Sequence, residues 1–254
     1  MSGATGDEVM TVVAARALVG RRTCFVGIGA PSAAANLARR LYAPDLILIY
    51  ESGTIGAKPS VLPLSIGDGE LAETADSVVS VPEIFAYWLQ AGRVDVGFLS
   101  AAQIDRFANL NSTVIGRYDR PRVRLPGGGG APEIAAAARE VFVVMKHRRE
   151  AFVEQIDFVT SGGFLSGADA RQRSGSRGGG PTQVITDLGI LAPHPKTREL
   201  VLVAVHPGVT VPEVRDATGW ELQALPDVRV TAPVGDDELR TLRDLHEKTS
   251  RAHA

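Results

Sequence analysis

The feature that most constrains this chain is a continuous apolar run, residues 46–50, that ends on a carboxylate. A run without charged positions is typical of a strand buried on both faces of a parallel sheet. Glu51 follows at once, and Ser52-Gly53 begin a turn. A carboxylate at the end of a buried strand is costly unless it is solvated or paired, and α/β proteins bind their ligands at the carboxyl ends of strands. Glu51 is therefore a candidate reactive group.

Helical and strand periodicities alternate along the whole chain. The expected helices cover residues 7–18, 32–41, 82–90, 131–139, 211–218 and 236–252. The expected strands cover residues 23–26, 46–50, 94–99, 141–145, 157–160, 184–191 and 200–205, with a loop-rich region at 103–116. This alternation predicts an α/β fold, an open and mostly parallel sheet with helices on both faces, formed by a single domain over residues 1–254.

Composition excludes several classes of protein. A hydrophobic fraction of 44% with 22% charged residues is ordinary for a soluble globular chain. The 27 basic and 29 acidic residues nearly balance, which argues against nucleic acid or a membrane surface as a partner. The N-terminus lacks the pattern of a signal peptide, no apolar run is long enough to span a bilayer, and Cys24 is the single cysteine. We expect a soluble, cytoplasmic protein without disulfides.

Two glycines follow the first expected strand. Gly27-Ile28-Gly29 resembles half of a dinucleotide fingerprint, but Ser32 stands where the third glycine belongs. A tight strand–helix turn with free amides is the better interpretation, and such a turn can help to bind an anionic ligand.

The histidines and the basic segments give no strong site. No histidine pair has a metal-ligand spacing, so we predict no metal site, and His206 before Pro207-Gly208 favours a turn role over a catalytic one. Residues 146–149, Lys-His-Arg-Arg, read as a solvated strand end, with phosphate binding as the alternative. Residues 166–181 carry three arginines among Gly and Ser. We interpret them as a mobile surface loop, the alternative being a phosphate clamp.

The segment from Glu51 to Gly56, Glu-Ser-Gly-Thr-Ile-Gly, resembles the glutamate signature of class I CoA-transferase β subunits. Further matching segments appear in the same order over nearly the whole chain: 26–31, 102–105 with Gln103 and Asp105, 109–111 with Asn111, 128–133, 206–210 and 218–220. Within this family the sequence is similar to β subunits that act on 3-oxoadipate and on glutaconate.

The resemblance implies a fold and a reaction. The fold is the open α/β sheet shared by CoA-transferases and some sugar-phosphate isomerases. The implied reaction moves CoA from an acyl-CoA donor such as succinyl-CoA to a 3-oxo dicarboxylic acid such as 3-oxoadipate, through a covalent glutamyl-CoA thioester on Glu51. CoA thioesters are substrates, and no permanently bound cofactor is implied. The family also implies a separate α subunit as partner, usually in an α2β2 heterotetramer.

The same resemblance assigns supporting roles. Backbone amides of Gly129, Gly130 and Ala131 are candidates for holding the oxyanion, and Gly27 and Gly29 for binding CoA. Some 3-oxoacid transferases carry an Asn donor two residues before the first glycine of the Gly-x-Gly turn, where this chain has Phe25.

That departure leaves open a thioester hydrolase of the same fold that uses Glu51 as general base. A non-catalytic ligand sensor would not need the intact Glu-Ser-Gly motif. The distal carboxylate of the acid has candidate partners in Arg106, Arg117, Arg120 and Arg124.

Overall fold

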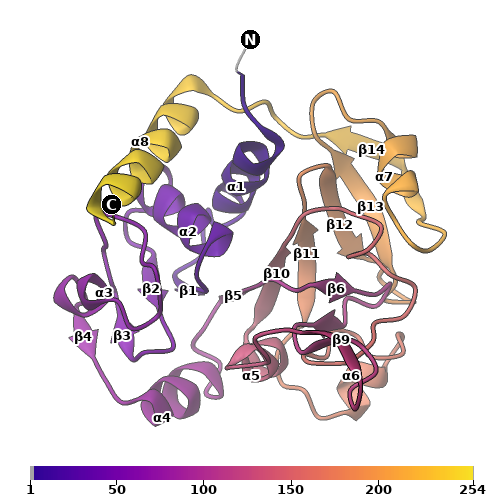
Figure 1. Ribbon diagram of the computed structural model, residues 1–254, viewed down its shortest axis with the longest axis horizontal. Coiled ribbons are helices and arrows are strands. Elements are labelled where there is room, and N and C mark those ends of the chain that lie inside the picture. Colours follow the sequence, from indigo (N-terminus) through magenta and orange to yellow (C-terminus); the bar gives the residue numbers. More distant parts are fainter. Residues whose placement is uncertain (1–2, 254) are drawn as a thin grey trace.

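One mixed sheet organises the molecule in the computed structural model, which describes residues 3–253 (Figure 1). In chain order its strands are β1 (Thr23–Phe25), β2 (Ile47–Ile49), β3 (Thr54–Ile55), β4 (Ser77–Val78), β5 (Val96–Leu99), β10 (Glu140–Val144), β11 (Pro181–Ile185), β12 (Gly189–Pro193), β13 (Leu200–Val205) and β14 (Ala224–Val230). Their order across the sheet is β14-β13-β12-β11-β10-β5-β1-β2-β3-β4.

The centre of this sheet is parallel and its flanks are not. Strands β11, β10, β5, β1 and β2 run in one direction, as does the outer pair β13 and β14. Antiparallel pairs join β2 to β3, β3 to β4, β11 to β12 and β12 to β13. The predicted mostly parallel α/β sheet is confirmed for the central strands, whose carboxyl ends share one edge.

Helices cover both faces. The first face carries α1 (Gly6–Arg16), α2 (Ala30–Leu41) and α8 (Asp236–Ala252), which lie together in Figure 1, and α3 (Gly69–Glu73) packs into the same core. The second carries α4 (Val81–Glu83), the π-helix η1 (Ile84–Leu89), α5 (Ala131–Ala137) and α7 (Val211–Asp216). Strand side chains alternate between the two cores, since Cys24 packs in the first and Phe25 in the second. No helix within residues 3–253 is both long and apolar enough to cross a membrane.

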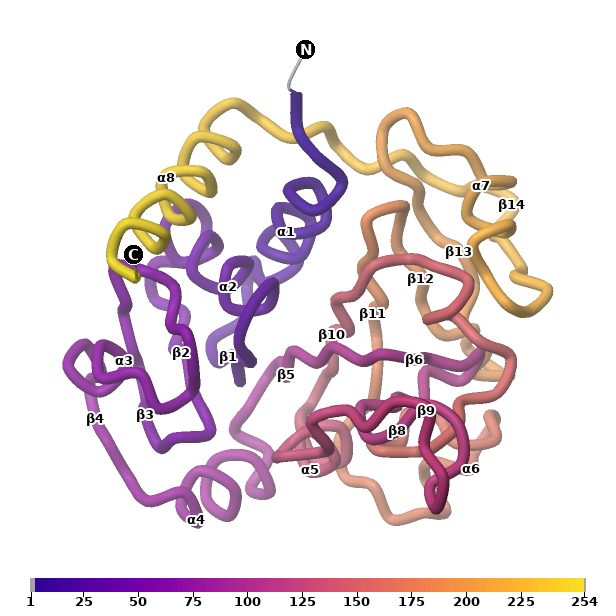
Figure 2. The backbone as a smooth tube through the Cα atoms, viewed as in Figure 1, coloured from indigo at the N-terminus to yellow at the C-terminus, as the bar shows by residue number. Residues whose placement is uncertain are grey.

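The expected loop region after β5 contains short strands. β6 (Gln103–Ile104) pairs with β7 (Leu110–Asn111), and β8 (Val114–Gly116) pairs with β9 (Pro121–Arg124). Figure 2 shows the chain passing from β5 through these strands before it enters α5. Strands of two to four residues are too short to carry a readable alternation of side chains.

Three expected elements differ from the structure. The expected strand 184–191 is the hairpin of β11 and β12, because the Thr186 hydroxyl oxygen accepts the N–H groups of Leu188 and Gly189 and turns the chain. Residues 157–160 form no strand. The expected helix 82–90 is helical, but from Ile84 onward its turns are π-helical.

Candidate active site

Glu51 lies on the tight turn that joins β2 to β3. The Tyr50 N–H donates to Thr54 O at 3.1 Å, and the Gly53 N–H donates to Tyr50 O at 3.0 Å. Gly53 has φ +105°, and a Cβ there would lie 2.0 Å from the Val79 carbonyl oxygen. Only glycine fits this position, so the Glu-Ser-Gly order follows from the turn that presents Glu51 at the edge of the sheet.

A glycine loop faces the Glu51 carboxylate. The Gly130 N–H donates to Glu51 Oε1 at 2.7 Å, a charge-assisted hydrogen bond between groups 79 residues apart in sequence. A Cβ on Gly130 would lie 2.0 Å from the same oxygen, and one on Gly129, whose φ is +48°, would lie 3.8 Å from it. Ala131 lies one residue further on, and its own N–H donates to Gly128 O at 2.9 Å. Gly130 is therefore the amide that meets the carboxylate.

The β6–β9 segment supports this loop. Ser112 bonds Gly127 twice, since its carbonyl accepts the Gly127 N–H at 2.8 Å and its hydroxyl donates to Gly127 O at 2.9 Å. Next to Ser112, the buried Asn111 amide donates to Gln103 Oε1 at 2.8 Å. Asp105 accepts three N–H groups from the turn between β6 and β7, and burial raises its pKa. The motif residues Gln103, Asp105 and Asn111 thus build the platform of the glycine loop.

Glu51 opens into a cavity of about 550 Å³. Apolar side chains of Ile66, Val81 and Phe85 form part of its wall. Its polar lining consists of Glu51, Ser52, Gln90 and Glu133, together with the backbone of Gly129 and Gly130. The Ser52 hydroxyl is buried and has no hydrogen-bond partner among the described residues.

Four of these lining residues, Ile66, Phe85, Gln90 and Glu133, were not predicted from the sequence. Phe85 and Gln90 reach the cavity together because of the π-helix. Gln90 N–H bonds Phe85 O at 2.8 Å, an i→i+5 pattern that stacks the two positions. In an α-helix, five residues would turn them about 140° apart. No sequence signal marks a π turn.

Phe25 lies behind this cavity. Its ring is fully buried and contacts Phe85 at a centroid separation of 5.8 Å. The apolar ring pair occupies the space beneath the cavity floor. Phe25 therefore contributes packing and no donor.

No lysine or arginine lines the cavity of Glu51 among residues 3–253. The four arginines proposed for a substrate carboxylate lie elsewhere: Arg106 pairs with Glu154, Arg117 with Asp119, Arg124 stacks over Tyr118, and Arg120 is exposed. This chain alone thus offers an acidic wall.

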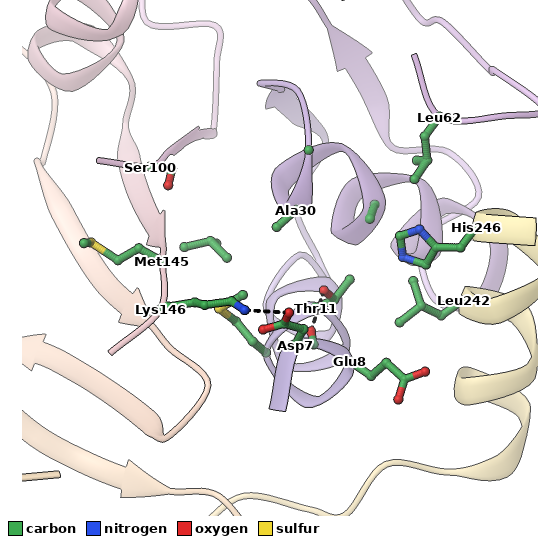
Figure 3. Close-up of a pocket in the computed structure, with 14 residues that line it drawn as sticks. Asp7, Glu8, Thr11, Ala30, Leu62, Ser100, Met145, Lys146, Leu242 and His246 are labelled. Carbon is green, nitrogen blue, oxygen red and sulfur yellow. Dashed lines mark hydrogen bonds and ion pairs between the residues drawn. The ribbon is translucent and has the colours of Figure 1, made fainter. Parts of the chain in front are cut away.

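The other predicted glycines occupy a different place. Gly29 begins α2 and lines a cavity of about 420 Å³ at the carboxyl ends of β5 and β10, between α1 and α8 (Figure 3). The Lys146–Asp7 ion pair, 2.8 Å long, crosses it, and Glu51 is not among its lining residues. Nothing lies within 4 Å of a Cβ added to Gly27 or Gly29, and their role in CoA binding stays a prediction.

Arg171 makes the segment 166–181 a tie within the protein. Its guanidinium is buried and donates to carbonyl oxygens of Gly178, Gly162, Gly163, Ala135 and Ala136. All of these are neutral acceptors of the protein itself. Neither a phosphate clamp nor a mobile loop describes this arginine.

His147 is likewise buried, which corrects the expectation of a solvated strand end. Its ring stacks on Phe152 at 3.7 Å, and Nε2 lies 2.9 Å from Thr218 Oγ1. Burial lowers the pKa of His147 to about 3. His206 is also buried; burial lowers its pKa, and Nε2 donates to the Thr186 carbonyl at 2.8 Å. Both rings are neutral structural groups, and no three His, Cys, Asp or Glu side chains within residues 3–253 form a metal cluster.

Comparison with known proteins identifies the family. The family model for Coenzyme A transferase matches residues 8–217. The chain belongs to this family. It is 55% identical over 253 residues to the β subunit of 3-oxoadipate CoA-transferase from Pseudomonas knackmussii, covering 100% of this chain and 97% of that protein.

More distant relatives share the fold. The crystal structure of glutaconate coenzyme A-transferase from Acidaminococcus fermentans superposes with a TM-score of 0.88 at 32% identity, covering 95% of this chain and 94% of that one. The cholesterol ring-cleaving hydrolase IpdB subunit of Mycobacterium tuberculosis is 28% identical over 224 residues, covering 84% of this chain and 82% of that protein. The predicted CoA-transferase resemblance is thus confirmed at the level of the family.

Proposed function

We propose that this chain is the β subunit of a 3-oxoadipate CoA-transferase, with Glu51 as the nucleophile. The observation that carries the proposal is the 2.7 Å hydrogen bond from the Gly130 N–H to Glu51 Oε1. It holds a carboxylate at the carboxyl edge of a parallel sheet, in a cavity large enough for an acyl group. The 55% identity to a 3-oxoadipate CoA-transferase β subunit supports this acid as acceptor and an acyl-CoA such as succinyl-CoA as donor.

The reaction divides into balanced exchanges at carbonyl carbon. A Glu51 oxygen attacks the thioester of the donor, the C–S bond breaks, and CoA leaves as thiolate from an acyl-glutamyl anhydride. The thiolate attacks the Glu51 carbonyl carbon and releases the donor carboxylate, which leaves a glutamyl-CoA thioester. The acceptor carboxylate then attacks this thioester, and the freed thiolate takes the acceptor's acyl group from the second anhydride.

Gly130 serves the two steps in which the Glu51 carbonyl itself is attacked. In both, negative charge develops on a Glu51 oxygen, and the Gly130 N–H already points at Oε1. A single preorganised donor of this kind contributes roughly 10²–10³ in rate. The backbone amide takes over the task for which Phe25 offers no side-chain donor.

An α subunit completes the site in this proposal. The cavity wall of this chain is acidic, through Glu51 and Glu133, whereas a dicarboxylic acceptor is itself an anion. Its distal carboxylate needs a cation, which we assign to the α subunit, in the α2β2 arrangement usual for the family.

The second candidate function is a CoA-thioester hydrolase in which Glu51 activates water. The IpdB relative, named a hydrolase, favours keeping this alternative. Its identity of 28% is far below the 55% shared with the transferase.

Steady-state kinetics of the co-produced α and β subunits test the proposal. With succinyl-CoA, we expect 3-oxoadipate to accept CoA and Glu51→Gln to lose roughly 10⁴-fold or more of the transfer rate. Glu73→Gln is the matched control, because Glu73 is an exposed carboxylate at the end of α3. Release of free CoA at the full rate without acceptor would favour the hydrolase, and full transfer by Glu51→Gln would exclude both mechanisms.

A further inference from the structure

The ring of Phe85 and the carboxylate of Glu51 meet at one point of the backbone. A Cβ placed on Gly130 would lie 2.0 Å from Glu51 Oε1 and 2.6 Å from Phe85 Cζ. The ring edge and the reacting oxygen therefore border the same small volume above Gly130. The contact is apolar on one side and charged on the other, which a surface carboxylate ordinarily avoids in favour of water.

The ring is held in this place from behind. Phe25, fully buried, contacts it at 5.8 Å with the two ring planes at 48°. Ile84 and Leu89, on the same π-helix, are both buried in the second core. With its neighbours fixed in a packed core, Phe85 has no room to swing inward and must keep its edge toward Glu51.

The chemistry gives this placement a consequence. A glutamyl-CoA thioester on Glu51 is open to attack by water as well as by the acceptor acid. If water adds to the Glu51 carbonyl carbon, the C–S bond breaks, CoA leaves as the thiol and Glu51 returns to a carboxylate. A transferase has to suppress that step, and it does so by excluding water from the reactive carbonyl.

We propose that Phe85 decides between transfer and hydrolysis by shielding the Glu51 carbonyl from water. This inference rests on the proposed function and adds a residue to it. The π-helix turns Phe85 into the cavity, Phe25 fixes its ring, and the ring offers no hydrogen bond to a water molecule beside Glu51. An acceptor carboxylate, positioned by the α subunit, reaches the carbonyl from the open side of the cavity.

The test uses the full complex with the α subunit and measures two rates for each variant. One is the release of free CoA from succinyl-CoA without acceptor, and the other is transfer to 3-oxoadipate. We expect Phe85→Ala to raise the ratio of hydrolysis to transfer roughly tenfold or more. Phe85→Leu keeps apolar volume without the ring edge, and its ratio should fall between those of Phe85→Ala and the unsubstituted complex.

Tyr87→Ala is the matched control, because Tyr87 lies on the same π-helix but is 62% exposed and outside the cavity lining. We expect it to leave the ratio unchanged. A ratio equal to that of the unsubstituted complex in both Phe85 variants would overturn the shielding role, and Phe85→Leu provides this result if Phe85→Ala does not fold.

Mass spectrometry of the quenched complexes separates this inference from the proposed function. CoA held on Glu51 in every variant, with an unchanged ratio, contradicts only the role of Phe85. Absence of CoA from Glu51 in the unsubstituted complex contradicts the covalent mechanism and the shielding role with it.

Discussion

At the scale of single residues, the site depends on space as much as on chemistry. Gly130 supplies an N–H to Glu51, and its missing side chain leaves room for the carboxylate. Glu51 and the glycine loop were predictable, because a strand end, a turn motif and a glycine run are written in consecutive letters. Phe85 was not, because its role depends on a π turn and on a neighbour, Phe25, 60 positions earlier in the sequence.

Gly130→Ala tests the demand for space. The new Cβ would lie 2.0 Å from Glu51 Oε1, so the carboxylate must move out of line with the amide. We expect a loss of roughly 100-fold in kcat, with little change in the melting temperature. Gly69→Ala is the control, since nothing lies within 4 Å of a Cβ there. Near-normal kcat in Gly130→Ala would contradict the close approach of this glycine and Glu51.

At the scale of elements, the sequence predicts long and periodic segments well and short ones poorly. The terminal helix, Asp236–Ala252, has the predicted bounds. The hairpin of β11 and β12 was predicted as one strand, because its turn depends on hydrogen bonds from Thr186 that apolar periodicity does not reveal. Arg171 looked like part of a surface loop for the same reason, since its five carbonyl partners come from distant segments.

Arg171→Met tests whether this arginine ties the elements together. The substitution keeps an apolar stem but leaves buried carbonyls of α5 and the loops around it without donors, at about 1–3 kcal/mol for each group. We expect the free energy of unfolding to fall by about 3 kcal/mol or more in urea titration. Arg173→Met, on the same helix α6 (Ala170–Arg173) but exposed, should change it by less than about 0.5 kcal/mol. Equal effects of the two substitutions would contradict the account.

At the scale of the whole molecule, buried histidines connect parts that the sheet alone does not. His147, after β10, lies against Thr218, which follows α7, and beside Thr186 of the β11–β12 turn. These contacts join the parallel centre to the antiparallel flank. The sequence shows His147 only within a basic run, since stacking on Phe152 is a tertiary contact.

The depressed pKa of His147 gives the stability a pH dependence. In the folded protein the ring stays neutral down to about pH 3, whereas in the unfolded chain it takes up a proton near pH 6.5. Between these values the unfolded state binds more protons, so this stability is present above pH 6.5 and is lost as pH falls. One such group contributes up to about 1.4 kcal/mol per pH unit.

Urea unfolding at a series of pH values from about 7 to about 4 measures this slope. We expect His147→Gln to be less steep than the unsubstituted protein by about one proton. The exposed His246 is the matched control, and His246→Gln should keep the original slope. An unchanged slope in His147→Gln would show that the ring is not held neutral.

The most direct test of the central claim is the mass of this chain after reaction. The complex with its α subunit is mixed with succinyl-CoA without acceptor and quenched in acid, and the peptide that contains Glu51 is analysed by mass spectrometry. The account predicts one CoA on Glu51 in the unsubstituted protein and in Glu73→Gln, and none in Glu51→Gln. CoA bound at another residue, or active complexes that never carry CoA on Glu51, would contradict it.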